Sequence, residues 1–241
     1  AGYYSNYLSL IGIPFMIIGP IFWFLFPVFS EMIAKNEQEK IKTIKSIFTK
    51  NFLSFSIAFS ILFFVFWSVI ATILFGDKFL MSWVILQYSV LFLSFNFLLQ
   101  INFNILAANG KIKERLHIIL IALVFNTILN YILLLWIWVA GAAVATWLGW
   151  ILIWVLSEMK LKEYHTAFDY KYLLKNIWVF GIIWIGMYYF LVPFIESFQH
   201  RWYEFFWLVF ISILYFALYF IVNLSDFKYF YHEIKKIKKW A

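Results

Sequence analysis

Long apolar stretches, almost free of charged residues, follow one another along the chain and are separated by short polar segments. Seven of them are long enough to cross a bilayer as a helix: 7–29, 52–75, 80–108, 118–138, 139–156, 177–195 and 202–224. A helix of about 20 residues spans the roughly 30 Å of hydrocarbon in a bilayer. Because a helix satisfies its own backbone hydrogen bonds, it is the form that such a segment takes in lipid. The pattern predicts an all-α integral membrane protein with seven transmembrane helices.

The segment between the first two stretches, residues 35–50, has an amphipathic pattern. Ile41, Ile44 and Ile47 recur three residues apart, and lysines occupy many of the other positions. A basic amphipathic helix is typical of the membrane surface, where its lysines contact anionic headgroups. We expect a cytoplasmic surface helix at about 35–50 that is anchored to lipid headgroups, with gating of a cavity mouth as the alternative.

The basic residues indicate the orientation in the membrane. Of the 19 Lys and Arg residues, all but Lys78 and Arg201 fall on one side of the membrane if the seven spans are correct. Cytoplasmic loops carry an excess of Lys and Arg. We therefore expect the N-terminus outside and the C-terminus inside.

The composition excludes several classes of protein. The residues AVILMFWYC make up 65% of the chain and charged residues 13%, whereas a soluble domain is about half apolar and a quarter charged. There is no cysteine, so disulfides and thiolate chemistry are excluded. The net charge of +7 is explained by cytoplasmic lysines, and we expect no nucleic-acid partner.

Polar residues inside the spans are the candidates for function. Asn96, Gln100 and Asn104 recur every four residues in the third span, and Asn126 and Asn130 do so in the fourth, so each set shares a helix face. Amides in a membrane helix either bond to a neighbouring helix or line a watery cavity. We expect these five to line a substrate cavity, with interhelical bonding as the alternative.

Small residues mark one helix contact. Gly141, Ala145 and Gly149 follow one another at intervals of four in the fifth span. This spacing lets two helix backbones approach closely. It predicts packing and no ligand.

No motif of a soluble enzyme occurs. The four histidines, His117, His165, His200 and His232, lie at span ends or in loops without the spacing of metal ligands. The chain has no glycine-rich phosphate loop and no pair of carboxylates within a span. We expect no catalytic residues, no metal and no cofactor.

Two long segments resemble landmarks of polysaccharide flippases. Residues 3–40 read YYSNYLSLIGIPFMIIGPIFWFLFPVFSEMIAKNEQEK, similar to a flippase helix that opens with Tyr-Ser, carries a proline and ends before a basic surface segment. Residues 104–150 read NILAANGKIKERLHIILIALVFNTILNYILLLWIWVAGAAVATWLGW. They resemble the next landmark, in which an A-x-G-K turn precedes a helix with N-x-x-x-N and then GAAxAT. The chain is similar to Wzx-type flippases of O-antigen or capsule repeat units, within the multidrug/oligosaccharidyl-lipid/polysaccharide exporters, and the last two spans match in hydropathy alone.

The resemblance implies half of a two-lobed transporter. Residues 1–157 would belong to the C-terminal transport lobe, 158–224 would form two trailing transmembrane helices, and 225–241 a basic cytoplasmic tail. The N-terminal lobe is not within these 241 residues, so a longer chain or a second chain would supply it.

The resemblance also implies a substrate and a location. An oligosaccharide on undecaprenyl pyrophosphate would be moved from the cytoplasmic to the periplasmic leaflet of the bacterial inner membrane, by alternating access. Lys111, Lys113 and Arg115 would meet the pyrophosphate at the cytoplasmic mouth, because no Lys or Arg lies in the middle of a span.

Alternatives within transport are a lipid II flippase and a drug/cation antiporter; the antiporter would be favoured by an acidic residue in the membrane. A seven-helix receptor fits the orientation, but the last span lacks the lysine of a retinal protein. A membrane glycosyl- or acyltransferase would use a histidine near a span end, and His117 and His200 have no acidic partner nearby in the sequence.

Overall fold

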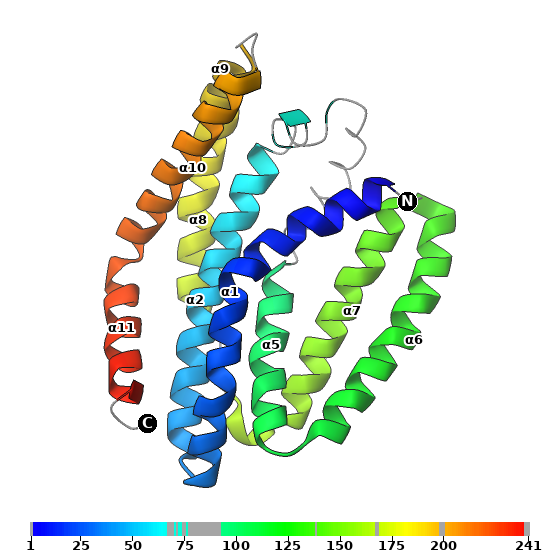
Figure 1. The fold of residues 1–241 in the computed structure, drawn as a ribbon, viewed down its shortest axis with the longest axis vertical. Helices are drawn as coiled ribbons and strands as arrows, with labels where there is room; N and C mark the ends of the chain where they lie inside the picture. The colour runs from blue at the N-terminus through cyan, green and yellow to red at the C-terminus, as the bar shows by residue number, and fades with distance from the viewer. Residues whose placement is uncertain are drawn as a thin grey trace.

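The computed structural model describes residues 2–66, 70, 72–73, 76, 93–137, 139–166, 169–197 and 201–238, and these form helices joined by short turns (Figure 1). The helices before residue 161 are α1 (Gly2–Ala34), α2 (Gln38–Val65), α5 (Leu93–Ala108), α6 (Ile112–Ile137) and α7 (Val139–Lys160). A 3₁₀ turn, η2 (Lys162–Tyr164), leads to α8 (Tyr170–Gly186), the π-helical turn η3 (Met187–Leu191), α9 (Val192–Glu196), α10 (Arg201–Val222) and α11 (Leu224–Lys238).

Helix α2 lies at the centre of the bundle. On one side it packs against α5 and α1. Helix α7 packs against α5 on the side away from α2, and α6 packs against α7 as the outermost helix (Figure 1). On the other side it contacts α8, α10 and α11. The predicted transport lobe and the two predicted trailing helices therefore meet along α2.

Aromatic rings fill the two interfaces of α2. Phe22 of α1, Phe52 of α2 and Phe97 of α5 contact one another with ring centroids 4.9–6.1 Å apart. On the other side the Tyr215 hydroxyl of α10 donates to the Ala58 carbonyl of α2 at 2.8 Å. Buried aromatic side chains contribute large apolar areas, and a buried tyrosine finds a partner for its hydroxyl.

Five of the described helical segments are long and apolar enough to cross a membrane: Gln38–Val65, Ile112–Ile137, Ala140–Lys160, Lys171–Ile195 and Trp202–Val222. A shorter apolar segment, Ile18–Ala34, ends α1. Residues 80–92 of the predicted third span and Lys78 lie outside the described residues, and α5 forms the remaining part of that span, 93–108. The number seven and the orientation therefore stay predictions.

The predicted surface helix at about 35–50 differs from the structure. From Gln38 onward, these residues are the first turns of α2, which continues without a break to Val65. Ile41 and Ile44 are buried in the bundle core, not turned toward a membrane surface. At 28 residues α2 is about 42 Å long, more than the hydrocarbon thickness. Its lysine-bearing turns therefore extend beyond the apolar layer as part of a spanning helix.

The basic segments gather at one end of the bundle, which we call the lysine-rich end. The α1–α2 and α5–α6 junctions and the end of α7 lie together there (Figure 1). Two ion pairs join the α5–α6 junction to the end of α7: Lys111 with Glu163 at 2.9 Å and Lys160 with Glu114 at 3.6 Å. This arrangement agrees with the one-sided distribution of lysines along the sequence.

Candidate functional site

A polar pocket of about 500 Å³ lies between α1, α5 and α6, near the lysine-rich end; we call it the α1–α5–α6 pocket. Its polar side chains are Gln100, Asn104 and Arg115. The remaining lining consists of Phe15, Gly19, Phe22, Trp23, Phe26 and Ala107. The structure thus brings together three of the predicted site residues, two from the amide set and one from the basic set.

The polar groups of this pocket retain free hydrogen-bonding capacity. The Asn104 Nδ2 donates to the Phe22 carbonyl at 3.2 Å, which leaves the Asn104 Oδ1 as an acceptor. Gln100 has no hydrogen-bond partner among the described residues. The Arg115 guanidinium lies 4.8 Å from the centre of the Phe103 ring, and no described carboxylate pairs with it. A cation–π contact holds the guanidinium in place without consuming its hydrogen-bond donors.

A tight turn places Arg115 at the mouth of the pocket. Gly110 adopts a φ of 72°, which favours glycine, and ends α5. The Gly110 N–H bonds to the Ala107 carbonyl at 3.0 Å and the Lys111 N–H to the Leu106 carbonyl at 2.9 Å. Helix α6 therefore starts directly beside the end of α5, and its first turn carries Arg115 over the α5 surface.

The other two predicted basic residues lie elsewhere. The Lys111 ammonium donates to Glu163 of η2, and this hydrogen bond raises the pKa of Lys111 above its ordinary value. Lys113 is exposed and lies outside the pocket lining. Of the three residues predicted for the pyrophosphate, only Arg115 combines a place in the pocket with free donors.

The structure does not bring Asn126 and Asn130 to the α1–α5–α6 pocket. The Asn130 Nδ2 donates to the Asn126 Oδ1 at 2.8 Å along α6. The Asn126 side chain lies against α7, where a Cβ added to Gly149 would be 3.6 Å from the Asn126 Nδ2. The pair therefore belongs to the α6–α7 contact, which corresponds to the alternative of interhelical packing.

Asn96 also lies outside the lining of this pocket. Its Oδ1 is buried and has no hydrogen-bond partner in the described part of the chain. The pocket thus contains only two residues of the predicted stripe, Gln100 and Asn104, and not Asn96.

A charged cluster that the sequence analysis missed joins α2, α5 and α7. Lys45, 2% exposed, pairs with Glu158 at 2.9 Å between Nζ and Oε2. Asn102 donates from Nδ2 to Glu158 at 3.1 Å and to the Ser157 hydroxyl at 2.9 Å. Each charge of the pair compensates the other inside the bundle, and together with Asn102 the pair links α2, α5 and α7. Removing either partner would leave the other charge buried and uncompensated.

Helical periodicity contains a signal for this cluster. Lys45 falls on the apolar stripe of Ile41, Ile44, Phe48 and Phe52, so it points into the core with them. The stripe does not reveal the partner, since Glu158 lies 113 residues further along the chain.

The comparisons with known proteins support the class of protein and nothing finer. No family model matches the chain, and no solved structure matches it significantly. A relative is the "Uncharacterized membrane protein MJ1068" of Methanocaldococcus jannaschii, 29% identical over 163 residues, which are 66% of this chain and 31% of that protein. The match therefore spans less than a third of the length of that relative. Together with the apolar helices, it identifies the chain as a helical membrane protein that crosses the bilayer several times.

Proposed function

We propose that the chain is part of a flippase that moves lipid-linked oligosaccharides across the membrane, and that the α1–α5–α6 pocket receives the polar headgroup. The observation that supports this is the set of polar groups in that pocket with free hydrogen-bonding capacity: the Arg115 guanidinium, the Gln100 carboxamide and the Asn104 Oδ1. In this proposal the protein lies in the bacterial inner membrane with its lysine-rich end in the cytoplasm, and the substrate enters from that side.

The chemistry of the lining suits a sugar phosphate. A guanidinium binds phosphate through two parallel hydrogen bonds. Carboxamides offer both donors and acceptors to hydroxyl groups. Trp23 and Phe26 provide apolar faces, and ligand pockets commonly combine such faces with a few polar groups. Arg115 would hold the pyrophosphate, and the two amides would contact the first sugars.

The charge of the pocket argues against a cationic substrate. Arg115 is the one charged residue among its lining residues, and no carboxylate lies there. A drug/cation antiporter would bring a second positive charge beside the guanidinium, which is unfavourable at low dielectric. A lipid II flippase would carry a pyrophosphate too, so this related activity differs from the leading proposal in the glycan alone.

Export in cells that lack their own flippase tests the proposal. In the complete protein, Arg115→Ala and Gln100→Leu should each lower export of the polysaccharide. The export rate of Arg115→Ala should fall about tenfold, because a charge-assisted hydrogen bond contributes about 1.5 kcal/mol. Arg115→Lys should retain part of the activity, since a lysine keeps the charge but loses the bidentate geometry.

The double variant Asn126→Leu/Asn130→Leu is the matched control. It removes two amides from the α6–α7 contact and none from the pocket. Export should stay within about twofold of the unmodified protein, with all variants quantified in the membrane fraction. Unchanged export by Arg115→Ala and Gln100→Leu would show that the pocket is not the substrate site.

A further inference from the structure

A second cavity, of about 530 Å³, lies on the opposite side of α2, between α2, the connection that leads into α8, and the start of α11. We call it the α2–α11 cavity. Most of its lining residues carry a hydroxyl, amide or charged group; they are Lys42, Thr43, Ser46, Ile47, Thr49, Lys50, Asn51, Leu53, His165, Thr166, Asp169, Tyr172, Asp226 and Tyr229. The proposed transport function uses none of these residues.

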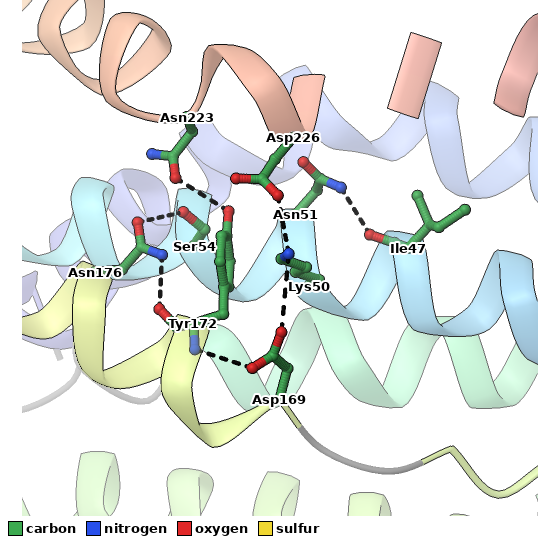
Figure 2. A network of polar contacts seen from close by, with 9 residues as sticks. All are labelled: Ile47, Lys50, Asn51, Ser54, Asp169, Tyr172, Asn176, Asn223 and Asp226. Atoms are coloured by element: carbon green, nitrogen blue, oxygen red, sulfur yellow. Dashed lines mark hydrogen bonds and ion pairs between the residues drawn. The ribbon is translucent and has the colours of Figure 1, made fainter. Parts of the chain in front are cut away.

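Two carboxylates in this cavity share one ammonium group (Figure 2). The Lys50 Nζ lies 2.8 Å from Asp226 and 3.8 Å from Asp169, and 4.0 Å from the centre of the Tyr172 ring. The Asp169 carboxylate also accepts from the Tyr172 backbone N–H at 3.0 Å, as the N-cap of α8. With one positive and two negative groups, this end of the cavity has a net negative charge.

An unused acceptor lies at the same end. Asn51 is 8% exposed, and its Nδ2 donates to the Ile47 carbonyl at 2.8 Å (Figure 2). Its Oδ1 is buried and has no hydrogen-bond partner in the described part of the chain. Rotating the amide would place that oxygen against the Ile47 carbonyl, so rotation does not satisfy it. A buried acceptor without a donor is rare in folded proteins and calls for a ligand or water.

Two basic residues also line the cavity. Lys42 lies about two turns before Lys50 in α2, and His165 is exposed, with its Nδ1 3.7 Å from the Glu158 carboxylate. The Lys42 ammonium pairs at 2.8 Å with Glu39, whose side chain is 86% exposed. Such an exposed pair contributes little free energy, so Lys42 can exchange Glu39 for a phosphate at small cost.

The cavity lies beside the ends of two candidate spans. It opens where α8 begins, immediately before the candidate span Lys171–Ile195, and at the start of α11, which follows the candidate span Trp202–Val222. The ends of membrane spans lie near the lipid headgroups. We propose that the α2–α11 cavity binds the headgroup of an aminophospholipid. Its primary ammonium would lie beside Asp169, Asp226 and the Asn51 Oδ1 and balance the carboxylate charge that Lys50 leaves over, and its phosphate would lie beside Lys42 and His165.

The number and kind of acceptors favour a primary ammonium. Three N–H groups match the two carboxylates and the amide oxygen, whereas a choline headgroup has no N–H to donate. The hydroxyl groups of phosphatidylglycerol could donate to the Asn51 oxygen, but this anionic headgroup has no positive charge to balance the two carboxylates. The cavity therefore distinguishes phosphatidylethanolamine from phosphatidylcholine and phosphatidylglycerol.

Native mass spectrometry tests this proposal. The complete protein is reconstituted in vesicles with equal parts of phosphatidylethanolamine, phosphatidylcholine and phosphatidylglycerol, then extracted in mild detergent, and the retained lipids are counted. We expect phosphatidylethanolamine to be retained about tenfold over either competitor, the ratio that one charge-assisted hydrogen bond supports. Replacing it with its N,N-dimethyl derivative should remove most of this preference.

Three variants locate the site. Asp226→Asn, Asp169→Asn and Asn51→Leu should each bring the three lipids to nearly equal retention. Asp169→Asn is the variant that protects the fold, because asparagine also caps a helix. Glu163→Gln, which removes a carboxylate from the ion pair with Lys111 outside the cavity, is the matched control and should keep the preference. Equal retention of the lipids by the unmodified protein, a preference for phosphatidylglycerol, or an unchanged preference in Asp169→Asn and Asn51→Leu would each overturn the proposal.

Discussion

Lys45→Met should lower the stability of the protein by about 3 kcal/mol, because it leaves the Glu158 carboxylate without its ammonium partner inside the bundle. Lys45 is 2% exposed and the Glu158 side chain 22%. The cost lies at the lower end of the range for a broken buried pair, since Asn102 still donates to Glu158. Tryptophan fluorescence during heating in detergent measures it, with an expected fall of the midpoint by roughly 6–12 °C.

Two further variants separate the pair from a general effect of charge. The double variant Lys45→Met/Glu158→Leu removes both charges and should recover most of the stability, because replacing a buried ion pair by apolar groups is often neutral. Glu163→Gln breaks the more exposed pair with Lys111 and should cost less than about 1 kcal/mol. If Lys45→Met shifts the midpoint no more than Glu163→Gln does, the buried pair does not stabilise the contact of α2 with α7.

Gly141→Ala should destabilise the junction of α6 and α7, whereas Gly149→Ala should not. A Cβ at Gly141 would clash with the Leu133 carbonyl oxygen, a backbone atom that cannot move alone. A Cβ at Gly149 would meet the Asn126 Nδ2 at 3.6 Å, an ordinary contact. Overpacking of this kind costs typically 1–3 kcal/mol, and glycine-to-alanine replacement in an open helix gains up to about 1 kcal/mol.

The same thermal measurement checks this pair of variants, together with the fraction of protein that elutes as a single species in detergent. We expect a lower midpoint for Gly141→Ala and an unchanged or higher one for Gly149→Ala. Equal midpoints would mean that the close approach of α7 to Leu133 is not required for the fold.

The helices could be predicted from the sequence because membrane helices need long apolar stretches, and the charge-free segments mark most of them. The small residues at 141, 145 and 149 also allowed the close contact of α7 with α6 to be predicted, since close packing of helix backbones depends on local spacing. The surface helix at about 35–50 was wrong as a separate element. An amphipathic stripe identifies a buried face, but it does not tell whether lipid or other helices cover that face.

The candidate site could be predicted only in part for the same reason. Spacing by four places Asn126 and Asn130 on one face of α6, but it does not reveal that the two amides bond to each other and lie against Gly149. Gln100, Asn104 and Arg115 meet because the Gly110 turn brings α6 beside α5, and the approach of α1 closes the pocket. The network around Lys50 joins residues from three distant segments, so no local pattern announces it.

The proposed function requires the α1–α5–α6 pocket to be open to water. The absence of cysteine from these 241 residues allows a direct measurement of this property. A cysteine is introduced either at Gln100, eight residues before the end of α5, or at Leu120, eight residues after the start of α6 and 48% exposed on its surface. The thiolate form of a cysteine attacks a charged, water-soluble thiol reagent, and this form arises in water and is favoured near a guanidinium. We predict fast labelling of Gln100→Cys and negligible labelling of Leu120→Cys in intact vesicles. Labelling of Gln100→Cys as slow as that of Leu120→Cys would show that no hydrated pocket exists between these helices.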